Sequence, residues 1–199
     1  MGRRTRIAAF ALCAGLTAGH SAAGQTPSAP TVYALIMDAA GVPADTLARA
    51  QDDATRVFQL SGITLVWVDA KTCTALCLTI RIVARPVSAK SRDPHMLGVA
   101  ASTPEARGIN VWIFYPRIRA YSVDLGMHIS QLLGHVIAHE MGHLLLPYDT
   151  HSAAGVMRPA WDDAQVRAAV KGGLTFTPDQ AASIREHLSA CASPTRCAR

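Results

Sequence analysis

Apolar residues in the first part of the chain recur with two different periods. Three short runs, residues 31–37, 63–68 and 78–84, are rich in β-branched and apolar residues and alternate in polarity, which is typical of strands. Between the first two runs, apolar residues recur every three or four positions, which predicts an amphipathic helix over residues 44–60. One face of this helix carries the apolar set Leu47, Ala50, Ala54, Val57 and Phe58.

The second part of the chain is more helical. Residues 86–94 read as a polar loop, and residues 109–114 as a fourth strand. An apolar stretch with helical spacing follows over residues 130–145. Residues 178–188 form the last helical pattern, with Thr177 as a candidate N-cap and Pro178 at the first helical position. The predicted order is strand, helix, three strands and two helices, so we expect a single α+β domain.

The candidate chemistry lies in the apolar helix over residues 130–145, which contains the pattern His139-Glu140-x-x-His143. Residues four positions apart share one face of a helix, so both imidazoles can reach one metal ion. Glu140 projects about 100° further round the helix than His139. That direction suits a general base beside a metal-held water better than a third ligand.

A catalytic zinc site has three protein ligands and one open position, so one ligand is expected from outside this helix. Pro147 cannot continue the helix and favours an extended conformation at Leu146, so the chain turns away there. Three residues beyond that point are candidates for the third ligand. They are Asp149, His151 and, on the last helix, Glu186.

The segment from His139 to Trp161 resembles the metzincin zinc endopeptidases, and among them the matrixins. The resemblance covers about twenty residues. It consists of the motif at His139, the pair His151-Ser152, and the run Gly155-Val156-Met157-Arg158-Pro159-Ala160-Trp161. Leu146 replaces the glycine of the family pattern, and Asp149 stands where the family has its third histidine.

The resemblance favours His151 as the third ligand, because His151 precedes Ser152 and the methionine turn as the family histidine does. Some metzincins use an aspartate at the position of Asp149, so Asp149 stays the alternative. Met157 would form the methionine turn beneath the metal. Pro159 and Trp161 would form a possible wall of the substrate pocket.

The fold implied by the resemblance is metzincin-like. It has a twisted, mostly parallel sheet, an active-site helix, the methionine turn and a C-terminal helix. The strand over residues 109–115 would border the cleft and offer a free edge to an extended peptide.

We therefore expect a secreted zinc-dependent metalloendopeptidase. Its cofactor would be Zn²⁺, and a zinc-activated water would hydrolyse the peptide bond with Glu140 as general base and then acid. The ligands would be His139, His143 and His151. The alternative is a non-catalytic, zinc-bearing domain of the same fold that binds a peptide or protein.

The N-terminus indicates export. Three arginines, an apolar run over residues 7–18 and small residues at 21–24 are typical of a secretory signal peptide, which we place at residues 1–23. Residues 24–199 would form one catalytic domain. We expect a secreted or periplasmic protein with no stable membrane anchor, since the apolar run is short for a membrane span.

Removal of the signal changes the charge and cysteine content. The formal net charge of the full chain is +5, with nineteen basic and fourteen acidic residues. The signal holds three of the arginines and no acid, so sixteen basic residues remain and the excess is about +2. Such a balance gives no support to nucleic-acid binding. We expect a monomer that acts on peptides or proteins.

Four cysteines follow the signal, Cys73, Cys77, Cys191 and Cys197, and an even number in an exported chain suggests disulfides. Their spacing favours the pairs Cys73–Cys77 and Cys191–Cys197. A crossed pairing between the two regions stays open.

Overall fold

The computed structural model of this 199-residue chain describes residues 29–73, 77–85, 93–102, 109–146 and 151–191. Within them lies one five-stranded sheet with the strand order β2-β1-β3-β5-β4. The strands are β1 (Thr31–Asp38), β2 (Thr64–Trp67), β3 (Cys77–Val83), β4 (Gly98–Ser102) and β5 (Ile109–Phe114). β1, β2, β3 and β5 are parallel, and β4 pairs antiparallel with β5.

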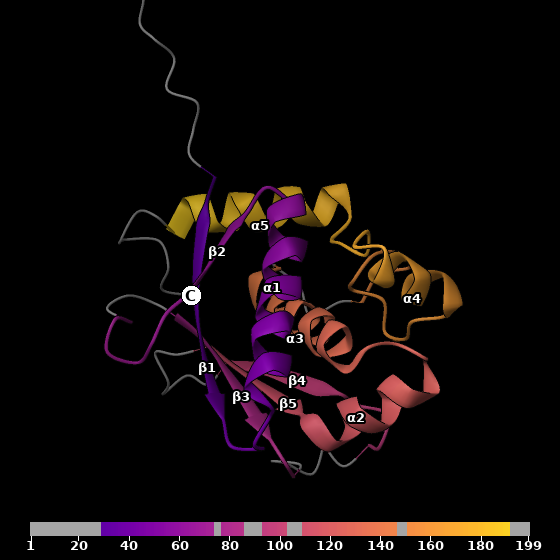
Figure 1. Ribbon diagram of the computed structural model, residues 1–199. Coiled ribbons are helices and arrows are strands. Elements are labelled where there is room, and N and C mark those ends of the chain that lie inside the picture. Colours follow the sequence, from indigo (N-terminus) through magenta and orange to yellow (C-terminus); the bar gives the residue numbers. More distant parts are fainter. Residues whose placement is uncertain (1–28, 74–76, 86–92, 103–108, 147–150, 192–199) are drawn as a thin grey trace, which may run out of the picture.

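The described residues also contain five helices, which complete an α+β fold (Figure 1). They are α1 (Ala44–Leu60), α2 (Tyr115–Asp124), α3 (Ile129–Leu145), α4 (Asp163–Val170) and α5 (Pro178–Cys191). α1 and α3 pack against each other and cover the same face of the sheet (Figure 1). Alternate strand residues therefore point into one core, and those with no exposed surface include Ala34, Ile80, Ile82, Val111 and Ile113.

The contact between α1 and α3 depends on Gly134. A Cβ added at Gly134 would lie 2.6 Å from the Ala50 carbonyl oxygen and 2.7 Å from the Asp53 Cβ. Only a residue without a side chain allows the two helices to approach this closely. This packing fixes α3 against the sheet, and α3 carries the His139 motif.

Most elements agree with the sequence-based prediction. The predicted helix over residues 44–60 and the strand over residues 109–114 are confirmed with the same bounds. The other predicted elements are confirmed within one residue at each end, except that α5 continues three residues further than expected. Thr177 caps α5 as predicted, since its hydroxyl accepts from the Gln180 backbone N–H at 3.4 Å.

Three elements were missed: β4, α2 and α4. β4 has the sequence Gly-Val-Ala-Ala-Ser, and its small residues give little strand propensity. α2 has Pro116 near its start, and its apolar residues are spaced with only a weak helical period. α4 is only eight residues long. β4 is held by its pairing with β5, whereas α4 begins with a capping box of Asp162 and Gln165, a local signal that the prediction overlooked.

The prediction that the strand over residues 109–115 has a free edge is wrong. β5 is paired on both sides, with β3 at Ile80↔Val111 and with β4 at Ala100↔Val111. Both edges of β5 are therefore used in the sheet. The strand at this side of the sheet is β4, which the sequence did not reveal.

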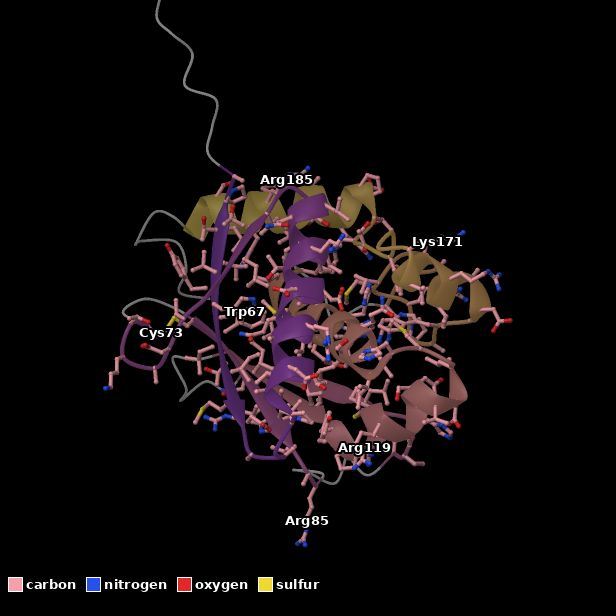
Figure 2. The ribbon with its side chains drawn as sticks, viewed as in Figure 1. Trp67, Cys73, Arg85, Arg119, Lys171 and Arg185 are labelled. Carbon is pink, nitrogen blue, oxygen red and sulfur yellow. A yellow bond between two sulfur atoms is a disulfide. The ribbon has the colours of Figure 1, made fainter. Side chains whose placement is uncertain are left out.

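One of the predicted disulfides is present. Cys73 and Cys77 are bonded, with their Cα atoms 6.2 Å apart, and the bridge joins the segment after β2 to the start of β3 (Figure 2). Cys197 and residues 1–23 lie outside the described residues, so the second pair and the signal peptide stay predictions. None of the helices in the described part of the chain has the length and apolar character needed to cross a membrane.

Candidate metal centre

The C-terminal half of α3 presents the motif residues toward the sheet and the following loop. α3 is capped at its start by His128, whose ring nitrogen accepts from the Ser130 backbone N–H. At its other end, Leu146 has φ −83° and ψ 146°, so the helix stops in an extended conformation as predicted. Pro147, to which we attribute this turn, lies outside the described residues. The chain re-enters the described part at His151.

Three histidines meet at this point. One ligand nitrogen from each of His139, His143 and His151 lies within 4.8 Å of the others. The ring centroids are 4.8 Å apart for His139 and His143, 5.3 Å for His139 and His151, and 4.9 Å for His143 and His151. The three residues that we expected as ligands are thus adjacent, and this cluster could hold a metal ion.

The structure describes only one of the other two candidates for the third ligand. Asp149 lies outside the described residues, so its distance from the two helix histidines is not defined. Glu186 is on α5 with an exposed side chain, and it is not part of the histidine cluster. Among the described candidates, only His151 is placed to act with His139 and His143.

The orientation of His139 fits a metal ligand. Its Nδ1 lies 2.8 Å from the Val156 carbonyl oxygen, which can only accept, so Nδ1 carries the proton and Nε2 offers its lone pair. That Nε2 lies 3.1 Å from the Nε2 of His143. Two nitrogens held at about 2.0–2.1 Å from one tetrahedral zinc are about 3.3 Å apart. The donor set and the spacing therefore fit a transition-metal ion such as zinc.

Met157 packs against the backbone of α3 within the motif. A Cβ added at Gly142 would lie 2.4 Å from the Met157 sulfur and 2.8 Å from the Phe176 ring, so both side chains pack directly against the α3 backbone. Met157 is fully buried. The turn before it requires Gly155, which has φ +74° and lies against the Thr175 carbonyl. Met157 is therefore a buried residue that packs against α3 at Gly142, next to His143.

Glu140 lies beside the cluster and beneath β4. Its side chain is buried, with 7% of its surface exposed. A Cβ added at Gly98, the first residue of β4, would lie 2.8 Å from Glu140 Cγ and 2.9 Å from Oε1. The carboxylate thus occupies the space that a side chain at position 98 would need. The missing side chain of Gly98 is what lets Glu140 lie there.

A cavity of about 410 Å³ opens over these residues. Its lining includes the three histidines and Glu140, and the expected wall residues Pro159 and Trp161 are also part of it. The opposite side is formed by β4 and the segment before it, and Tyr121 of α2 contributes as well. Apart from the buried Met157, the site residues named from the sequence and described by the structure therefore line one cavity.

His135, one turn before His139, is 3% exposed and does not line this cavity. Burial lowers its pKa, although the hydrogen bond between its Nδ1 and the Gln131 carbonyl and the nearby Asp53 carboxylate act in the opposite direction. Its ring packs edge-on against Trp161 at 6.1 Å. His135 is therefore part of the packing behind the site.

The sequence did not reveal two parts of the cavity. They are the wall made by Asp93 and residues 95–100, and the contribution of Tyr121. The apolar run from Met96 to Ala101 was the available signal for a short strand. Its pairing with β5 over the carboxylate of Glu140 is a tertiary feature that no local pattern contains.

In comparisons with known proteins, no family model and no curated protein matches this chain.

Proposed function

We propose that this protein is a zinc-dependent metalloendopeptidase with a metzincin-like fold, ligated by His139, His143 and His151. The observation that carries the proposal is the meeting of the three imidazoles with the buried Glu140 at one cavity. Imidazole ligands suit several transition metals, and zinc is the one most used for hydrolysis with an adjacent carboxylate. The mostly parallel sheet and the position of Met157 beneath α3 agree with this family.

A zinc ion bound here would supply Lewis-acid chemistry, which makes a water more acidic and polarises a carbonyl group. Glu140 would act as the general base and then as the general acid. Its carboxylate accepts the proton of the attacking water and then delivers it to the departing amine nitrogen. Its burial under β4 keeps bulk water away from the carboxylate and holds it in one position. His139, His143 and His151 would hold the metal.

The substrate would lie along β4. The far edge of this strand has no partner strand among the described residues, and the residues Leu97 to Ala100 line the cavity. An extended peptide can add to such an edge through main-chain hydrogen bonds. This arrangement would bring a peptide bond over the histidines while its side chains reach the cavity walls.

The function is tested with an internally quenched peptide library incubated with the purified protein. We expect cleavage within peptides, loss of cleavage with 1,10-phenanthroline and recovery on addition of Zn²⁺, because the chelator removes the metal and leaves the chain intact. Product masses would identify the bonds cut. If the zinc-loaded protein binds peptides of the library but cuts none of them, the non-catalytic alternative replaces the peptidase.

We predict that Gly98→Ala reduces turnover without loss of metal. The added Cβ would overlap the end of the Glu140 side chain, which can move, so the carboxylate is displaced while the fold is kept. A displacement of about 1 Å at a reacting group can reduce the rate about 100-fold. The measurements are kcat on a cleaved peptide, zinc content by mass spectrometry and the melting temperature.

The matched control is Gly173→Ala. A Cβ added at Gly173 would lie 3.7 Å from the Ala168 carbonyl oxygen, which is an ordinary contact. We expect this variant to keep the wild-type kcat. Equal rates for Gly98→Ala and wild type would show that the position of the carboxylate under β4 is unimportant for the reaction.

A further inference from the structure

The Val156 carbonyl has two donors. It accepts from Nδ1 of His139 at 2.8 Å and from the indole N–H of Trp161 at 3.3 Å. A carbonyl oxygen has two lone pairs, so both can be used at once. Trp161 therefore shares its acceptor with one of the three clustered histidines. Pro159 and Ala160, which stand beside it in the wall, have no such link.

The residue that carries this carbonyl is held on both sides. Val156 is fully buried, and its backbone N–H donates to the Thr175 carbonyl at 2.8 Å. The residue before it, Gly155, takes a positive φ against the same carbonyl. Val156, whose carbonyl is the acceptor of His139, is thus held at its N–H by the Thr175 carbonyl and at its carbonyl oxygen by the Trp161 indole.

The indole ring also contacts the imidazoles. Trp161 is 9% exposed, and its ring meets His139 at 6.4 Å with an interplanar angle of 70°. It also meets the ring of His135 at 6.1 Å with an interplanar angle of 82°. Edge-to-face contacts of this kind are the preferred arrangement of aromatic pairs. The indole therefore limits rotation of the His139 ring as well as orienting its acceptor.

Trp161 is itself anchored by the turn that contains it. The Arg158 guanidinium donates to the Asp162 carboxylate at 2.8 Å, which closes the chain around residues 158–162. Asp162 also caps α4, and its side chain accepts from the Ala164 backbone N–H at 2.8 Å. The position of the indole is therefore set by α4 and by the turn together.

We propose that Trp161 is a positioning residue for the metal ligand His139, in addition to its place in the cavity wall. The indole N–H holds the Val156 carbonyl in the direction that keeps the proton on His139 Nδ1 and the lone pair on Nε2. The inference rests on the metal site of the proposed function and does not require that the protein cleaves peptides. Outer partners of this kind typically change metal affinity about 10–100-fold.

The test compares Trp161→Phe with Trp67→Phe by titration with Co²⁺ under competition from a chelator. Phenylalanine keeps an aromatic ring at position 161 and removes the indole N–H. We expect about 10-fold weaker Co²⁺ binding and a changed visible spectrum of the bound ion, since Trp161 acts on the ligand through its acceptor.

Trp67 is the matched control. It lies on β2 (Figure 2), its indole N–H donates to the Thr55 hydroxyl at 2.9 Å, and neither residue lines the cavity. Trp67→Phe therefore loses the same kind of hydrogen bond, and we expect unchanged Co²⁺ affinity and spectrum. A Trp161→Phe variant with the wild-type affinity and spectrum would overturn the inference and leave Trp161 as a wall residue.

A measurement on the unmodified chain covers the case in which Trp161→Phe does not fold. In ¹⁵N-labelled protein, addition of Zn²⁺ should shift the indole N–H resonance of Trp161 and leave that of Trp67 in place. A Trp161 resonance that does not respond to bound zinc would overturn the inference and leave the proposed function standing. A wild-type protein that binds neither Co²⁺ nor Zn²⁺ would overturn the metal centre itself, and with it the proposed function.

Discussion

Replacement of Glu140 by glutamine should abolish most peptide hydrolysis and leave the metal bound. Glutamine has nearly the same shape but cannot accept a proton, and general acid–base catalysis typically contributes about 10²–10⁴-fold to the rate. Glu140 lies beside the histidine cluster and is not one of its three members. We therefore expect kcat to fall by about 10²–10⁴ at unchanged zinc content. The measurements are steady-state kinetics on a cleaved peptide and metal analysis by mass spectrometry.

Glu186→Gln is the matched control for this substitution. Glu186 is an exposed glutamate on α5, outside the residues that line the cavity. We expect its kcat to equal that of the wild type. Full activity in Glu140→Gln would exclude Glu140 as the base. Loss of zinc together with loss of activity would instead indicate that Glu140 helps to hold the metal.

The second large effect is expected from His151→Ala. This substitution removes one of three imidazoles that lie within reach of a common ion. Two histidines on α3 would then have to hold the metal alone. Loss of an outer partner of a metal ligand costs about 10–100-fold in affinity, so loss of a ligand itself should exceed about 100-fold. Zinc content after dialysis and a competitive titration would measure the change.

Asp149→Ala is the decisive companion to His151→Ala. If His151 is the ligand, the protein with Asp149→Ala should retain about one equivalent of zinc after dialysis, as expected for one three-ligand site. The reverse result, with zinc lost in Asp149→Ala and retained in His151→Ala, would assign the third position to Asp149. The melting temperatures of both variants in the presence of chelator would separate loss of metal from loss of fold.

The bounds of an element were predicted correctly from the sequence where the local pattern and the tertiary environment agree. α1 has an apolar face of regular spacing, and that face is buried against the sheet and α3, so its bounds were correct. The end of α3 at Leu146 was also predictable, because a following proline restricts the backbone whatever surrounds it. These features depend on a few neighbouring residues.

The prediction failed where an element is held by distant partners. β4 consists of small residues, and its strand conformation comes from pairing with β5. Without β4, the predicted sheet ended at β5, and a free edge was wrongly assigned to it. The roles of Gly98 and Tyr121 in the cavity depend on the same contacts. They could not be predicted from their own neighbourhoods.

By itself, the sequence determined the pair His139 and His143 with Glu140 between them, because helix geometry alone relates residues four positions apart. It also determined the candidates for a third ligand. The tertiary structure decided that His151 joins the pair, that β4 covers Glu140, and that Trp161 and His139 share the Val156 carbonyl. The physical reason is the range of the interactions. Backbone geometry sets relations within one helix, whereas His151 and the added strand β4 are positioned by packing between different segments of the chain.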